Sequence, residues 1–111
     1  MFVCVKSCDT SEALRQARRL AGPETPVVSL QNGLTHVGIT VRAFGGRRAV
    51  FGACYAAVLR ESPTVVRHQA GQTIRLGVTN DNRAAAAGAR RWLLAAGFEA
   101  PPEQREDRVL W

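Results

Sequence analysis

Long apolar runs are absent from this sequence. No stretch among its 111 residues approaches the roughly 18 apolar residues that a membrane-spanning helix needs. The N-terminal segment MFVCVKSCD has no basic residue ahead of its short apolar stretch, unlike a secretory signal peptide. The hydrophobic content of 46% and the charged content of 22% are typical of a globular domain. We therefore expect a cytoplasmic protein with no membrane partner.

Cysteine is scarce and its spacing excludes familiar metal sites. The chain has three cysteines, Cys4, Cys8 and Cys54, with no CxxC pair and no neighbouring histidine cluster. A structural zinc site needs four ligands at closer spacing. We expect no bound metal, and we expect reduced thiols that are mostly buried.

Lysine and aromatic residues are also few. Lys6 is the only lysine among 15 basic residues, and the chain has four Phe, two Trp and one Tyr. The formal net charge of +6 invites an anionic partner. However, the arginines are scattered, and no aromatic residue lies between them in a stacking array. We expect no nucleic-acid partner, and an arginine-rich nucleic-acid binder is the weaker alternative.

The hydrophobic spacing near the N-terminus predicts a β-α-β unit. Two apolar, β-prone runs, Phe2–Lys6 and Pro26–Leu30, have the character of buried parallel strands. Between them Asp9 and Glu12 have the spacing of a capping box, which marks the start of a helix. Gly22 and Pro23 follow as stop signals. The apolar positions of this helix are Ala13, Leu14, Ala17 and Leu20.

The remaining chain continues the α/β pattern. A helix is predicted over 34–44, and Gly52 in the strand that follows predicts a bulge or a close approach. Ala70-Gly71 predicts the turn of a hairpin. The other predicted elements are the strand Arg48–Leu59, the hairpin strands Thr64–His68 and Thr73–Val78, the helix Asn82–Ala96, a short strand from Phe98 and a helix start over Arg105–Trp111.

Polar residues end the two predicted parallel strands. Lys6 ends the first, and Gln31-Asn32-Gly33 ends the second. Ligands of open α/β sheets bind beyond the carboxyl ends of such strands, so these side chains are expected to face one crevice. Amides do no proton chemistry at neutral pH, so they would orient a ligand by hydrogen bonds. The alternative is that Asn32-Gly33 is simply a turn, and the spacing favours neither interpretation.

Four blocks of the sequence resemble one enzyme family. They are VCVKSCDTSEAL, VVSLQNGL, VFGACYAAVLRESPTVVRHQAGQTIRLG and AAGFEA…EDRVLW. In order and spacing, over nearly the whole chain, they resemble the ketopantoate reductases, also called 2-dehydropantoate 2-reductases. The QNG block with an upstream VK strand is the most specific. The resemblance implies NADP as the cofactor, a 2-oxo acid as the substrate, and reduction of 2-dehydropantoate to pantoate in the route to pantothenate and coenzyme A.

The resemblance also implies roles for individual residues. Lys6 matches a lysine that contacts the cofactor, and Asn32 matches an asparagine that contacts both cofactor and substrate near the nicotinamide. Val58 falls where the family makes a backbone contact to the cofactor. Gln31 and Gly33 are neighbours in the motif and weaker candidates. His36 and His68 match no catalytic position, so we expect surface or internally bonded histidines.

The departures from the family pattern limit this prediction. The phosphate-binding GxGxxG of the family's first βαβ unit is absent from the sequence. The family's catalytic lysine lies two residues beyond the match to Trp111, and its catalytic glutamate lies in a helical C-terminal domain. The resemblance therefore implies that 1–111 form the latter part of an NADP-binding domain. We expect a Rossmann-like parallel sheet without its first βαβ unit, extended by an antiparallel hairpin, with no catalytic residue and no activity alone.

One further alternative stays open. The chain also fits a non-catalytic α/β module that binds a small ligand or a protein. An incomplete sheet would expose a strand edge, which invites pairing with another chain. We therefore expect homo-oligomers formed through that edge.

Overall fold

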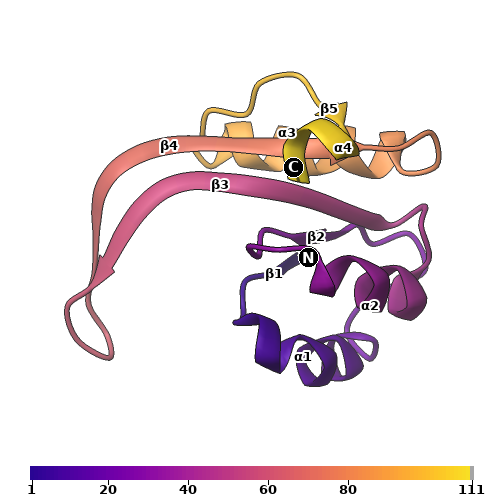
Figure 1. Cartoon of the computed structure of the whole chain (residues 1–111), viewed down its shortest axis with the longest axis horizontal. Coiled ribbons are helices and arrows are strands. Elements are labelled where there is room, and N and C mark those ends of the chain that lie inside the picture. Colours follow the sequence, from indigo (N-terminus) through magenta and orange to yellow (C-terminus); the bar gives the residue numbers. More distant parts are fainter. Residues whose placement is uncertain (111) are drawn as a thin grey trace.

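A five-stranded mixed sheet organises the chain (Figure 1). The computed structural model describes residues 1–110. In sequence order the strands are β1 Phe2–Val3, β2 Val27–Ser29, β3 Ala49–Arg60, β4 Val66–Val78 and β5 Gln104–Arg105. The spatial order is the same; β1, β2 and β3 are parallel, β3 and β4 are antiparallel, and β4 and β5 are parallel. The predicted α/β architecture with a parallel core and a hairpin extension is confirmed.

Helices cover both faces of the sheet. They are a 3₁₀ turn Ser7–Asp9, α1 Thr10–Ala17, α2 Thr35–Phe44, α3 Arg83–Ala95 and α4 Glu106–Leu110. Neighbouring residues Val27 and Val28 of β2 are both buried but belong to different apolar clusters. Val27 packs with Leu14 of α1 and Phe44 of α2, whereas Val28 packs with the α3 side of the sheet. Burial on both faces explains why this strand is an unbroken apolar run.

The hairpin prediction is wrong in its position. The structure has one continuous strand, β4, where two strands around Ala70-Gly71 were expected, and the chain reverses between β3 and β4 over residues 61–65. Gly71 instead lies where the strand register shifts between Tyr55 and Ala57, with φ of 69°, and an added Cβ would collide with the Tyr55 backbone oxygen. Position 71 therefore requires glycine because of a β-bulge rather than a turn. The outer halves of β3 and β4 project from the body as a two-stranded arm (Figure 1).

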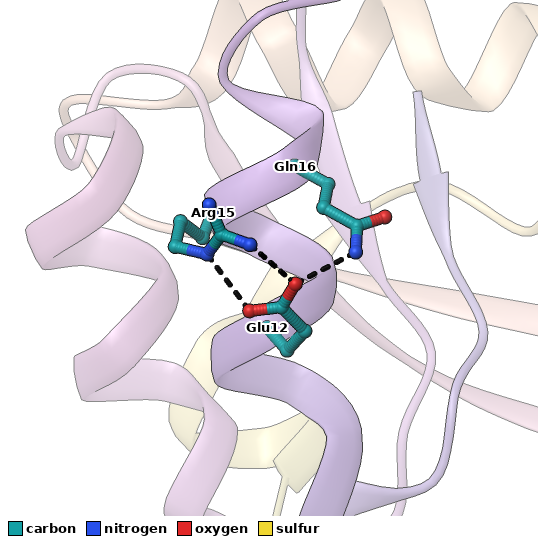
Figure 2. Close-up of polar contacts among 3 residues, drawn as sticks. All are labelled: Glu12, Arg15 and Gln16. Atoms are coloured by element: carbon teal, nitrogen blue, oxygen red, sulfur yellow. Dashed lines mark hydrogen bonds and ion pairs between the residues drawn. The ribbon is translucent and has the colours of Figure 1, made fainter.

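The N-terminal unit forms with three corrections. β1 covers only Phe2–Val3 of the predicted strand, and Leu20 lies beyond the end of α1 with 84% of its surface exposed. The capping box does not form, because the Asp9 side chain makes no cap hydrogen bond. Glu12 instead accepts hydrogen bonds from Nε of Arg15 at 2.8 Å and Nε2 of Gln16 at 2.7 Å (Figure 2). These bonds lower the pKa of Glu12 to about 2.

The other predicted elements agree more closely with the structure. The helix over 34–44, the long strand and the Ala-rich helix appear as α2, β3 and α3. The expected strand from Phe98 reduces to a single parallel bridge between Thr73 and Glu99. The C-terminal helix begins at Glu106, and Trp111 lies outside the described residues. Within 1–110, no helix has both the length and the apolar character needed to span a membrane.

Candidate functional site

The carboxyl ends of β1 and β2 open into a cavity of ≈ 530 Å³. Lys6 and Asn32 both line it, which confirms the prediction that these two strand ends face one crevice. Both residues are exposed. In the described part of the chain, neither side chain hydrogen-bonds to another protein group. An ammonium and an amide thus face the cavity with their hydrogen-bonding capacity free.

Gln31 has a different role from the one its position suggested. Its side chain is buried, with only 8% of its surface exposed. Nε2 donates to the backbone oxygen of Val5 at 2.6 Å and to Oγ1 of Thr10 at 2.7 Å, and Oε1 accepts from the Ser29 hydroxyl at 3.0 Å. The prediction that both amides orient a ligand is therefore wrong for Gln31, because all its polar atoms are used inside the protein. A buried amide must find such partners.

The Asn32-Gly33 segment forms a tight connection between β2 and α2. Gly33 has a φ of 87°, in the left-handed region that favours glycine, and an added Cβ would meet nothing within 4 Å. The demand for glycine here is therefore conformational rather than steric. Among the described residues, the Asn32 side chain accepts no hydrogen bond from its own turn, which a purely structural asparagine would be expected to do.

Both histidines form hydrogen bonds inside the protein, as expected. His36 is fully buried; its Nδ1 lies 2.9 Å from the Ser29 hydroxyl and its Nε2 lies 2.6 Å from the backbone oxygen of Gly33. Its ring also packs at a tilt against Phe51. His68 is exposed on the arm and its Nε2 contacts the backbone oxygen of Gly71.

The cysteines are exposed, so the expectation of mostly buried thiols is wrong. All three are free, and all three line the same cavity as Lys6 and Asn32. Burial, and then the neighbouring Cys54, raise the pKa of Cys4. Spacing along the chain gave no sign of this convergence, because Cys54 reaches the cavity from β3. Within 1–110, no three His, Cys, Asp or Glu side chains are grouped as metal ligands would be.

Val58 lies away from this cavity. It is four residues beyond Cys54 on β3, opposite His68 of β4, and 55% of its surface is exposed. At about 3.3 Å per residue, that separation is roughly 13 Å along the strand. The structure therefore brings Lys6 and Asn32 together but leaves Val58 on the arm.

A larger cavity of ≈ 730 Å³ lies between α2, the end of β4, α3 and α4. Two of its four charged side chains, Arg105 and Asp107, form an ion pair at 3.0 Å, whereas Arg83 and Glu106 have no ion-pair partner among the described residues. Burial, and then Asp107, raise the pKa of Glu106. The smaller cavity is the better candidate site because it lies at the carboxyl ends of the parallel strands, where open α/β sheets bind their ligands.

Comparison with known proteins supports the family prediction. The family model for ketopantoate reductase PanE/ApbA matches residues 1–81. No curated protein gives a significant match.

Solved structures show the same fold. 2-Dehydropantoate 2-reductase from Geobacter metallireducens GS-15 is 23% identical with a TM-score of 0.80, and the match covers 95% of this chain and 35% of that one. D-mandelate dehydrogenase with NADH and anilino(oxo)acetate is 20% identical with a TM-score of 0.76, and the match covers 89% of this chain and 32% of that one. Dimeric ketopantoate reductase from Staphylococcus aureus is 15% identical with a TM-score of 0.69, and the match covers 89% of this chain and 34% of that one. The chain thus spans about a third of these relatives' length, and it belongs to the ketopantoate reductase family.

Proposed function

We propose that the cavity at the ends of β1 and β2 binds the nicotinamide half of NADPH. The observation that carries this proposal is the pair of exposed, unpaired side chains Lys6 and Asn32 at adjacent strand ends of a family member. In this proposal 1–111 form the latter part of an NADP-binding domain, and the whole protein reduces a 2-oxo acid, with 2-dehydropantoate as the substrate.

The two side chains suit different parts of such a ligand. The Lys6 ammonium offers three donors and a positive charge to a phosphate, a carboxylate or a ribose hydroxyl. The Asn32 amide can donate to one group and accept from another, so it can fix the nicotinamide relative to the substrate carbonyl. NADPH would supply the hydride, and the protein's contribution is orientation and polarisation of the carbonyl.

This chain holds only part of the machinery in this proposal. The sequence contains no GxGxxG to cradle the pyrophosphate and no residue that matches the family's proton donor. We therefore assign no catalytic residue to 1–111. Val58 is proposed as a further cofactor contact on the strength of the resemblance, reached only by a ligand that extends along the arm.

A titration followed by amide chemical shifts tests the proposal. NADPH is expected to produce saturable shifts centred on Lys6 and Asn32. Lys6→Ala should weaken binding about five- to tenfold, the cost of a charged hydrogen bond of roughly 1–1.5 kcal/mol at an exposed site. Arg18→Ala, which removes an exposed cation outside the cavity, is the matched control and should bind normally. Saturable shifts confined to another surface, or none up to millimolar NADPH, would refute the proposal.

A second candidate function rests on the arm. Five large apolar side chains are 47–63% exposed there: Tyr55, Val58, Leu59, Val65 and Val66. Exposed apolar patches often mark protein contacts. A non-catalytic protein-binding module would use this surface rather than the cavity, so substitutions at Lys6 and Asn32 would leave its binding unchanged.

A further inference from the structure

The buried polar side chains beneath the candidate site form one connected network. Ser29 lies between Gln31 and His36, 3.0 Å from the amide oxygen of one and 2.9 Å from Nδ1 of the other. Ser29 and His36 are fully buried, and Gln31 is 8% exposed. Carbonyl oxygens at both ends of the network determine the orientation of its side chains.

The backbone oxygen of Val5 accepts only, so the Gln31 atom that contacts it at 2.6 Å must be Nε2. Oε1 of Gln31 then faces Ser29 and needs its hydrogen. At the other end the Gly33 oxygen also accepts only, so Nε2 of His36 carries a hydrogen and donates at 2.6 Å. The single hydroxyl hydrogen of Ser29 goes to Oε1 of Gln31, and the Ser29 oxygen also lies 2.9 Å from Nδ1 of His36. Ser29 thus lies between two side chains whose outer contacts are both anchored on backbone.

These anchor points flank the two ligand-facing residues. Val5 directly precedes Lys6, whereas Gln31 and Gly33 lie on either side of Asn32. Gln31 also donates to Thr10, the first residue of α1, which ties β2 to the segment that carries Lys6. The network therefore holds the neighbours of both residues while leaving their own side chains free.

We propose that Ser29, Gln31 and His36 are positioning residues that fix Asn32 and Lys6 relative to one another. His36 holds the backbone carbonyl of Gly33, the residue after Asn32. Gln31 holds the backbone carbonyl of Val5, the residue before Lys6. The benefit for binding rests on the proposed function of the cavity, because a preorganised pair binds a rigid ligand without first losing conformational freedom.

A comparison of two variants on α2 tests the proposal. His36→Leu removes the hydrogen bond to Gly33 and the polar contact with Ser29, and fills the buried site with an apolar side chain. Thr40→Val is the matched control. Thr40 is equally buried, one turn further along α2, and among the described residues its hydroxyl bonds only the backbone oxygen of His36, at 2.8 Å. Both changes are expected to lower Tm. Only His36→Leu should weaken NADPH binding, by about fivefold or more, and His36→Gln, which retains a donor for Gly33, should recover part of the loss.

Hydrogen exchange gives a readout that needs no ligand. Exchange of the Asn32, Gly33 and Leu34 amides should quicken at least tenfold in His36→Leu relative to Thr40→Val. If His36→Leu does not fold, Ser29→Ala takes its place, with a smaller change in the same direction. Equal exchange in the two variants would overturn the proposal. If the wild type binds NADPH, an unchanged affinity of His36→Leu for NADPH would overturn it as well. If the wild type binds no NADPH, the proposed function fails, and exchange still decides whether the network positions the site.

Discussion

Gly52 of β3 lies directly against Leu30, at the end of β2. An added Cβ would sit 2.9 Å from Cδ2 of Leu30, 2.9 Å from Cδ2 of Leu76 and 2.7 Å from the backbone oxygen of Arg75. The close approach that the glycine predicted is therefore confirmed. Because a backbone atom is among the three, side-chain rotation alone cannot relieve the contact.

Gly52→Ala is expected to destabilise the protein by about 1–3 kcal/mol, the usual cost of overpacking. Urea unfolding followed by circular dichroism measures it. Gly88→Ala is the control, since its added Cβ meets nothing within 4 Å on helix α3. That change should stabilise the protein by roughly 0.5–1 kcal/mol, because alanine is the better helix former. If Gly52→Ala leaves the free energy of unfolding unchanged, the sheet shifts easily at this point.

The local sequence pattern predicted β2, α2 and α3 well. The run at Pro26–Leu30, the helical spacing from Leu34 and the Ala-rich stretch each produced the expected element, because each carries its own periodicity. Lys6 and Asn32 meet because parallel strands place their carboxyl ends at one edge. The failures concern distant partners. Gly71 looked like a turn residue, but its geometry is set by Tyr55 across the sheet.

The candidate site shows the same limit. Nothing beside Gln31 in the sequence reveals that Val5 and Thr10, more than 20 residues earlier, take up its amide. The exposure of the cysteines likewise depends on the cavity walls rather than on residue type. The sequence therefore predicted which strand ends line this cavity, but not which side chains face it and which ones support them from inside the protein.

The carboxylate of Glu12 is expected to confer pH-dependent stability on α1. Its pKa is lowered to about 2, first by hydrogen bonds from Arg15 and then by that from Gln16. A lowered folded-state pKa gives stability that is present above the unfolded value, 4.5, and lost as the pH falls toward 2. Tm measured from pH 6 to pH 2 should fall less in Glu12→Gln than in the wild type. Parallel curves would show that this exposed cluster adds nothing to stability.

The three thiols are expected to react in the folded protein. All are exposed in one cavity, so iodoacetamide followed by mass spectrometry should label each of them without denaturant. Cys4 should be the slowest, because its raised pKa leaves less thiolate at neutral pH.

NADPH should slow all three reactions if it fills the cavity. A cysteine placed by Ser11→Cys, exposed on α1 outside the cavity, supplies the control and should react equally fast with and without NADPH. Protection at this control position as well would point to a general effect of the nucleotide rather than to a bound ligand.

The outer edge of β1 is expected to promote self-association. β1 is the first strand of the sheet and pairs only with β2 among the described strands, and 38% of the Phe2 surface is exposed there. Unpaired edges invite pairing with another chain, and charged residues discourage it. Light scattering should detect dimers or larger species at high concentration, and Phe2→Lys should shift them toward monomer. A wild-type chain that stays monomeric and melts cooperatively would contradict this expectation.

Asn32 offers the sharpest distinction between a ligand contact and a turn residue. If the amide serves a ligand, Asn32→Ala should leave stability within about 0.5 kcal/mol of the wild type, as for an exposed side chain without partners. NADPH affinity should then fall about three- to tenfold, the cost of one hydrogen bond of roughly 0.5–1.5 kcal/mol. If the amide serves the turn, stability falls and affinity per folded molecule is unchanged. Gly33→Ala calibrates the comparison: its φ of 87° makes the substitution costly by about 1–2 kcal/mol without any steric contact. An Asn32→Ala protein as unstable as Gly33→Ala, with intact affinity, would remove Asn32 from the site.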